Sequence, residues 1–217
     1  WCSNNAISSS VLNGSLFTSG THTVVFTATD DNQNTRSMTL TFTVNDGVAP
    51  VATVPSTIMA TNDPGMCGAV VNLPVPSGTD NCGIDTAYYS IASGSVFSVG
   101  VTPVTLTVVD FDGNTDQGTF NVVVQDTEKP VFTSVPADTT LGYCNNALAY
   151  ALPTASDNCG IGSVSLVSGI ASGNQFPVGS TVNIYEVVDI HGNSDTVSFT
   201  VTVQAQISAP VPVYGAI

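Results

Sequence analysis

Carboxylates are the side chains of this sequence best suited to chemistry, because they recur at matching places in two groups. The first group is Asp46, Asp80, Asp110 and Asp112, and the second is Asp126, Glu128, Asp157 and Asp189. Hard oxygen ligands that converge from several loops suit Ca²⁺, which takes six to eight of them. Each group is therefore a candidate calcium site, and Ca²⁺ is the only cofactor that we expect.

A simpler interpretation of the same residues is that Asp and Asn side chains cap turns. A difference between the copies favours it, since the second group has His191 where the first has Asp112. At this point both interpretations stay open.

Cysteines form the second chemically distinctive set. Cys67 and Cys82 are 15 residues apart, and so are Cys144 and Cys159, in similar surroundings (GMCGAVV and TDNCG, then GYCNNAL and SDNCG). We expect a disulfide within each pair, and closing a loop of about 15 residues stabilises by roughly 3 kcal/mol. Cys2 aligns with Cys82, so its partner is expected upstream of residue 1. Paired cysteines indicate an oxidising, exported location.

These motifs belong to a repeat that fills the chain. TDNCGI at Thr79–Ile84 recurs as SDNCGI at Ser156–Ile161, and DFDGN at Asp110–Asn114 recurs as DIHGN at Asp189–Asn193, with DDNQN at Asp30–Asn34. A period of about 80 residues is one small domain per repeat, as in an array of modules. The predicted organisation is the C-terminal part of a truncated module at 1–46, complete modules at 47–126 and 127–204, and a proline-containing tail or linker at 205–217.

Hairpins must position the acidic turns. Alternating apolar residues predict three strand pairs, each joined by a D-x-x-x-N turn: 21–29 with 38–44, 101–109 with 118–124, and 180–188 with 196–203. Weaker strands are expected at 51–60, 68–75, 84–92, 131–141, 147–152 and 161–170. About seven short strands per module predict an all-β chain of tandem immunoglobulin-like β-sandwiches, two complete and one N-terminally truncated.

The sandwich topology predicts where the acids meet. The DNCG loop and the D-x-x-x-N turn should both lie at the end of the module where the chain enters it. Each acidic group should therefore converge on the short acidic linker that precedes its module, Val44–Pro50 for the first group and Val124–Pro130 for the second. Such short linkers join neighbouring modules semi-rigidly.

Composition excludes several classes of function. With 16 acidic and two basic residues, the net charge is −14, so the chain cannot neutralise a run of nucleic-acid phosphates. No apolar run has the length of a membrane span. The two histidines, His22 and His191, lie at non-equivalent repeat positions, and no recurring Ser–His–acid set, phosphate loop or zinc spacing is present. We therefore expect no catalytic residues and no enzyme activity.

The combined motifs GMCGAVV, PVPSGTDNCG, SVFSVGVTPVTLTVVDFDGN and TFNVVVQD, with their counterparts in the next copy, resemble the hyalin-repeat (HYR) family of immunoglobulin-like modules. The resemblance covers nearly all of residues 1–204. Members of that family commonly carry a second cysteine pair, which is absent here. Its positions are taken by Val54 and Val135 before the first-strand prolines, and by Ser37, Gly118 and Val197 in the last strands. The resemblance implies extracellular adhesion and spacer modules, often in very large bacterial surface proteins.

Glycosylation is a further expectation. Thr86, Thr139 and Thr196 each follow Asp and precede a small, aliphatic or Thr residue, which resembles the acceptor motif of exported Bacteroidetes proteins. The abundance of Thr offers chance as the alternative explanation.

Together these observations predict a non-enzymatic, extracellular repeat region of a large exported surface protein, which acts as a stalk or adhesin module. The expected source is a bacterium of the Bacteroidetes type. The expected partners are neighbouring repeats of the same chain, together with surface glycans, proteins or like subunits. One alternative is a structural subunit of a self-assembling filament or sheath. Another is a set of accessory modules of a secreted hydrolase.

Overall fold

The computed structural model describes residues 6–206, which contain strands and no helix, and therefore none that could cross a bilayer. The chain divides into two compact units. Unit 1 comprises Trp1–Ile58, Asn72–Ser95 and Pro103–Val122, and unit 2 comprises Met59–Val71, Val96–Thr102 and Val123–Ile217. We call residues 1–46, 47–126 and 127–204 the first, middle and last modules.

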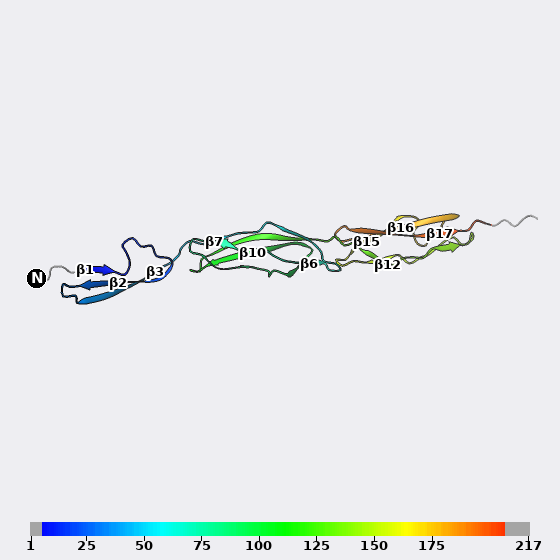
Figure 1. Ribbon diagram of the computed structural model, residues 1–217. Coiled ribbons are helices and arrows are strands. Elements are labelled where there is room, and N and C mark those ends of the chain that lie inside the picture. Colours follow the sequence, from blue (N-terminus) through cyan, green and yellow to red (C-terminus); the bar gives the residue numbers. More distant parts are fainter. Residues whose placement is uncertain (1–5, 207–217) are drawn as a thin grey trace, which may run out of the picture. The chain divides into compact units, whose positions relative to one another are not determined.

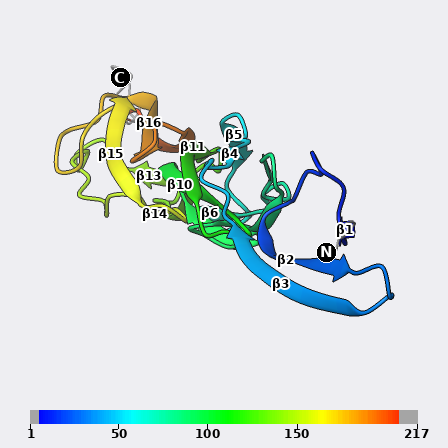
Figure 2. The ribbon, with the colours of Figure 1, turned by 90° about the vertical axis from the view of Figure 1, so that its left-hand side faces the viewer.

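The first module contributes one antiparallel sheet of order β1-β2-β3 to unit 1. Its strands are β1 (Ala6–Ser9), β2 (Gly20–Thr29) and β3 (Thr35–Val44). β2 and β3 pair along their whole length and form the long hairpin of Figure 2, which confirms the first predicted strand pair. Val24 is the one buried apolar residue of these strands, while Met38 and Leu40 of β3 stay 67% and 49% exposed, so the apolar face of this sheet is only partly covered by the described residues.

The rest of unit 1 is built from the middle module. β4 (Val51–Ala52) pairs with β7 (Gly78–Thr79), and β8 (Ile84–Tyr89) pairs with β10 (Gly100–Asp110), which in turn pairs with β11 (Thr115–Gln125). β10 and β11 are the second predicted hairpin. Both strands are longer than the pattern of apolar residues indicates, because Thr and polar residues continue the ladder at either end.

The core of unit 1 explains how an acid comes to be buried. Successive side chains of a strand point to opposite faces, so alternate residues line one face. Val104, Leu106 and Val108 of β10 form such a row and are 0% exposed. Asp110 is the next residue of this row and is 2% exposed. The strand period therefore places the first turn acid at the end of the apolar core.

Unit 2 holds the last module and the remaining strands of the middle module. Its strands are β5 (Ile58–Thr61, which starts in unit 1), β6 (Gly68–Val71), β9 (Ser95–Ser98, likewise), β12 (Val131–Ser134), β13 (Thr139–Leu141), β14 (Thr154–Ser156), β15 (Ile161–Ser168), β16 (Gly179–Asp189) and β17 (Ser194–Val203). β5 pairs with β11, and β6 with β9. In the last module a sheet of order β13-β17-β16-β15 faces the pair β12-β14 (Figure 1).

Apolar residues from both sheets of the last module form its core, as in an immunoglobulin-like sandwich. Phe176, Tyr185, Phe199, Val201 and Val203 are buried there, and Phe132 of β12 packs against them. Asp189 follows the same row of β16 and is 3% exposed, as Asp110 is in β10. β16 and β17 pair in antiparallel fashion from Gly179 with Val203 to Val188 with Ser194, which confirms the third predicted hairpin.

One predicted strand of the last module is not a regular strand. Residues 147–152 form only a single bridge, Ala147 with Gln175. The chain is still extended there, but the N–H of Tyr150 donates to the Ser172 hydroxyl rather than to a backbone carbonyl. A side-chain acceptor satisfies the donor without continuing the ladder.

Candidate metal centres

The D-x-x-x-N turns hold their acids in one recurring geometry. In the middle module Asp110 Oδ1 accepts the N–H groups of Asp112 (2.9 Å) and Asn114 (2.8 Å), while Oδ2 accepts Asn114 Nδ2 (2.8 Å). Asp189 makes the same three bonds with His191 and Asn193 in the last module. Turn capping therefore accounts for every hydrogen bond of these two carboxylates.

The DNCG loops hold a second acid, and here capping accounts for only half of each carboxylate. Asp80 Oδ2 accepts the N–H groups of Cys82 (2.7 Å) and Gly83 (3.1 Å), and Asp157 Oδ1 accepts those of Cys159 (2.8 Å) and Gly160 (3.0 Å). The other oxygens, Asp80 Oδ1 and Asp157 Oδ2, are inaccessible to solvent and have no hydrogen-bond partner. An unpartnered buried carboxylate oxygen is costly, and the cost recurs at the same position in both copies.

A linker acid completes each group. Asp46 Oδ1 accepts the N–H of Val48 (3.0 Å), and its Oδ2 accepts Asn81 Nδ2 (3.1 Å). In the second group Asp126 Oδ1 accepts the N–H of Glu128 (3.2 Å). The amides of Asn114 and Asn193 donate to the backbone oxygens of Asp46 (3.1 Å) and Asp126 (3.4 Å), so each turn is tied to its linker.

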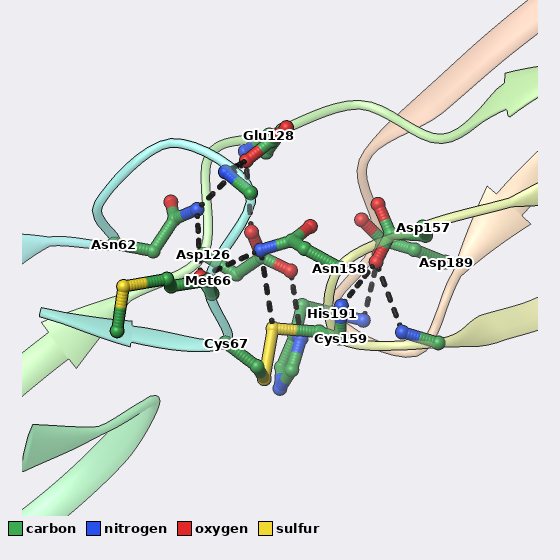
Figure 3. The surroundings of a disulfide bond; sticks show 12 residues. Asn62, Met66, Cys67, Asp126, Glu128, Asp157, Asn158, Cys159, Asp189 and His191 are labelled. Atoms are coloured by element: carbon green, nitrogen blue, oxygen red, sulfur yellow. Dashed lines mark hydrogen bonds and ion pairs between the residues drawn. A yellow bond between two sulfur atoms is a disulfide. The ribbon is translucent and has the colours of Figure 1, made fainter.

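Three carboxylates thus meet in each unit. Asp46, Asp80 and Asp110 form the first acidic cluster and Asp126, Asp157 and Asp189 form the second. Within each cluster one oxygen from every residue lies within 4.8 Å of the others. Figure 3 shows Asp157 and Asp189 of the second cluster next to each other, close to the disulfide. The acids come from three segments: a linker, a DNCG loop and a hairpin turn.

Local hydrogen bonds keep several of these acids ionised. Burial raises the pKa of Asp110, but the hydrogen bonds from Asn114 and from the turn N–H groups outweigh it, so that the pKa lies below its ordinary value. The pKa of Asp189 is lowered by the same balance. The pKa of Asp46 is lowered mainly by the N–H of Val48. Clusters with these pKa values carry concentrated negative charge at neutral pH.

Two residues of the predicted groups lie outside the clusters. Asp112 is exposed at the tip of its turn. Glu128 turns away from its group, and its Oε2 accepts the N–H of Gly65 (2.8 Å) and Asn62 Nδ2 (3.3 Å). The sequence places both residues near the clusters, but only the fold decides which neighbours they contact.

His191 has a role that its position in the turn did not reveal. Its Nδ1 lies 3.0 Å from Asp126 Oδ2, and the Asp126 side chain is 0% exposed. The second cluster thus has a histidine in contact with its linker acid, whereas the first has Asn81 there. The repeat could have indicated this position, because His191 aligns with Asp112, which belongs to the first predicted group of acids.

The donor set fits Ca²⁺. All three groups of each cluster offer hard oxygen, and Ca²⁺ prefers carboxylate and carbonyl oxygens and water. The unpartnered oxygens of Asp80 and Asp157 are the part of the clusters that turn capping does not explain. Three carboxylates provide fewer than six ligands unless some bind in bidentate fashion, so water would complete the sphere.

The predicted disulfides within modules are wrong. Cys67 of the middle module is bonded to Cys159 of the last, 92 residues away, with Cα atoms 4.7 Å apart (Figure 3). Cys82 and Cys144 are exposed, free thiols. Cys2, whose partner was expected upstream, lies outside the described residues.

Strand geometry explains the correction. The segment that follows Cys144 runs alongside residues 172–176. The N–H of Leu148 donates to the Asn174 carbonyl, the N–H of Tyr150 donates to the Ser172 hydroxyl, and the Asn146 carbonyl accepts the N–H of Phe176. This segment is therefore extended. An extended chain rises about 3.3 Å per residue, which separates residues 15 apart by tens of ångströms. A disulfide needs Cα atoms less than about 7 Å apart. The equal spacing of Cys67 and Cys82 therefore measures the length of a strand segment rather than a closed loop.

Two of the positions at which the family commonly has its second cysteine pair, Val54 and Gly118, lie next to each other. A Cβ added to Gly118 would lie 3.5 Å from the Val54 Cβ and would clash with the Val54 Cγ2. Glycine at 118 thus leaves room for the valine side chain. The two positions that the resemblance singled out are therefore in contact in unit 1.

The three threonines of the glycosylation expectation all lie in strands. Thr86 of β8 and Thr196 of β17 are exposed, and Thr139 of β13 is half-buried, with its hydroxyl donating to the Ala137 carbonyl (3.0 Å). The positions leave the expectation untested.

Comparisons with known proteins agree with the repeat. The family model described as "HYR domain" matches residues 45–124 and again 125–203. The chain is 37% identical to hyalin of Strongylocentrotus purpuratus over 96% of its length, and 36% identical to hyalin of Lytechinus variegatus over 87%. It spans 18% and 37% of those two relatives. It is also 28% identical over 73% of its length to 5% of the sushi, von Willebrand factor type A, EGF and pentraxin domain-containing protein 1 of Rattus norvegicus.

Among solved structures, the Protocadherin GammaB4 extracellular domain aligns with 85% of this chain and 40% of its own, at 16% identity and a TM-score of 0.37. The human Desmocollin-1 ectodomain aligns with 86% and 48%, at 12% identity and a TM-score of 0.33. These values are too low to carry an argument about function. The relatives come from sea urchins and a rodent, so the expected bacterial source finds no support among them.

Proposed function

Because the chain belongs to the HYR domain family, we propose that it is a spacer of an extracellular adhesion protein in which Ca²⁺ stiffens the passage from each module to the next. HYR domains are extracellular, and so is this chain. The proposed role is structural and not enzymatic, with neighbouring modules and other surface proteins or like subunits as partners.

The observation that carries the proposal is the pair of unpartnered oxygens, Asp80 Oδ1 and Asp157 Oδ2. Each lies in a cluster with a second, nearly fully buried acid, Asp110 or Asp189. Three like charges at such distances repel one another unless a cation or protons neutralise them. The lowered pKa values of Asp110 and Asp189 oppose neutralisation by protons at neutral pH.

Each of the three acids in a cluster would connect a different segment of the chain to the bound Ca²⁺. Asp46 or Asp126 holds the linker, the DNCG acid holds one loop and the turn acid holds the hairpin. Bound Ca²⁺ supplies two positive charges to this site. Asn114 and Asn193 already fix the linker backbone, so the linker acids meet the other carboxylates without a large rearrangement. Such a junction would resist bending at the linker.

Calcium titration of the full chain tests the proposal. Calorimetry in chelator-treated buffer is expected to detect two sites. Saturation about 100-fold above Kd should stabilise the site-bearing structure by about 2.7 kcal/mol, which raises Tm by about 5–10 °C.

Matched variants assign the two sites. Asp80→Asn should remove one site and Asp157→Asn the other, while Asp85→Asn, an exposed strand residue, should keep both. Absence of both binding heat and any Tm shift in the unmodified chain would refute the calcium proposal. The clusters would then be turn caps only.

A further inference from the structure

Among the described residues, the one disulfide pairs two different kinds of loop. Cys67 belongs to the loop that follows β5, and Cys159 belongs to a DNCG loop. Each complete module has one cysteine in a loop of the first kind and one in a DNCG loop. Because the disulfide uses one cysteine of each kind, one cysteine of each kind remains without a disulfide partner among the described residues. These are Cys82, equivalent to Cys159, and Cys144, equivalent to Cys67, and both are free and exposed.

Cys82 is held in the same conformation as its bonded equivalent. Its N–H and that of Gly83 donate to Asp80, as those of Cys159 and Gly160 donate to Asp157. The following glycines, Gly83 and Gly160, have φ of 107° and 117°, in the region that favours glycine. The amide Nδ2 of Asn81 lies 3.2 Å from Cys82 Sγ, and that of Asn158 lies 3.7 Å from Cys159 Sγ. The backbone of this loop thus takes the same course around the free Cys82 as around the bonded Cys159.

Cys144 likewise occupies the place of Cys67 relative to the final strand of its module. β13 runs parallel to β17, with Leu141 opposite Val203, and the N–H of Gln204 donates to the Leu141 carbonyl (2.9 Å). In the middle module the hydrogen bond at this place runs the other way, since the N–H of Asn62 donates to the carbonyl of Gln125, at the end of β11 (2.9 Å). Both loops therefore lie where the chain leaves a module, next to the point at which a following module would attach.

We propose that Cys67–Cys159 is one instance of a repeating bond between consecutive modules, and that Cys144 and Cys82 are half-sites for two more. The partner of Cys144 is the DNCG cysteine of a further module of this kind that follows. The partner of Cys82 is the cysteine of the loop equivalent to 62–67 in a module that precedes. Two thiols lose two protons and two electrons as the S–S bond forms, and a small disulfide such as oxidised glutathione accepts them and becomes two thiols.

The proposal does not depend on the calcium sites. Ala205 stands at the position of Asp46 and Asp126, so a junction after the last module lacks the linker acid. A module attached there would be held by the disulfide without the complete acidic cluster.

The test extends the chain after Ala205 with a second copy of residues 127–204, in a Cys2→Ser background, so that the new junction keeps Ala205 in place of a linker acid. Before extension, labelling of the folded chain with N-ethylmaleimide should modify Cys82 and Cys144 but neither Cys67 nor Cys159. After extension and incubation with oxidised glutathione, Cys144 should lose its labelling. Mass spectrometry of peptic peptides should find it bonded to the copied counterpart of Cys159.

Two controls are part of the design. Cys82 should stay labelled in the extended chain, because the extension adds no module before it. In the Cys144→Ser extended chain, the copied counterpart of Cys159 should become reactive. The intact Cys67–Cys159 bond reports that the chain is folded in each case. Continued labelling of Cys144 in the extended chain, or a Cys144–Cys159 bond within the module, would overturn the proposal.

Discussion

Cys67 and Cys159 form a disulfide across 92 residues and across two consecutive modules, and this bond lies beside the second acidic cluster. Asn158, which precedes Cys159, donates its amide to the carbonyl of Met66 (2.8 Å), which precedes Cys67. Glu128 of the linker binds the same loop through the N–H of Gly65 (2.8 Å). The covalent bond is therefore supported by hydrogen bonds from both sides, and its removal should affect the whole junction.

Loss of this bond should cost more than the predicted 15-residue loops would have contributed. The chain-entropy model gives about 4.6 kcal/mol for a closed loop of 92 residues, against about 3 kcal/mol for 15. The double variant Cys67→Ser, Cys159→Ser should lose up to that free energy of unfolding in denaturant titrations. Its matched control, Cys82→Ser with Cys144→Ser, should unfold like the unmodified chain. Equal losses in both would contradict the observed pairing.

The effect of Asp80→Asn on the free energy of unfolding should change sign when Ca²⁺ is added. The Asn Oδ1 can still accept the N–H groups of Cys82 and Gly83, and a neutral amide replaces the unpartnered oxygen. Without Ca²⁺ the variant should therefore be as stable as the unmodified chain or more stable, by about 1 kcal/mol at most. With saturating Ca²⁺ it should be less stable. Melting curves in chelator and in Ca²⁺ measure both, and a destabilisation of equal size in both conditions would indicate a turn cap alone.

Acid should destabilise the chain through its two turn acids. The pKa values of Asp110 and Asp189 are lower in the folded state than the ordinary value of about 3.9. The unfolded chain therefore takes up protons first as pH falls, so the contribution of these acids is complete above about pH 4 and is lost as pH falls through their folded pKa values. Asp110→Asn should be less stable at pH 7, and its deficit should shrink toward pH 2. Denaturant unfolding in chelator across this range checks the slope, and a constant deficit would contradict it.

A second disulfide should form if the cysteines typical of the family are restored. The Cβ positions of Val54 and Gly118 are 3.5 Å apart, within the range of disulfides. Val54→Cys with Gly118→Cys should therefore oxidise to a bond within the middle module and add up to about 4 kcal/mol of stability. Thiol counting and melting under oxidising and reducing conditions check this. The single variant Val54→Cys, which has no partner, should gain nothing.

Much of the candidate site could be predicted because its determinants are local. Strand alternation places Asp110 and Asp189 at the ends of buried rows, and D-x-x-x-N turns close on their own Asn side chains. The order of strands in a sandwich then implied that DNCG loops and turns meet at the linker. The predicted places of Asp112 and Glu128 in the acidic groups were wrong, because a residue at the tip of a turn and a residue in a linker can face several neighbours.

The sequence by itself determined the repeat, the three hairpins and the positions of the acids, since these follow from short-range periodicity and turn chemistry. Only the tertiary structure decided the disulfide. In a repetitive chain, Cys67 has one DNCG cysteine as a candidate in its own module, 15 residues away, and another in the next module, 92 residues away, and the repeat does not distinguish them. The extended segment that follows such a cysteine separates it from the near candidate, and the meeting of two modules brings the far one within 4.7 Å.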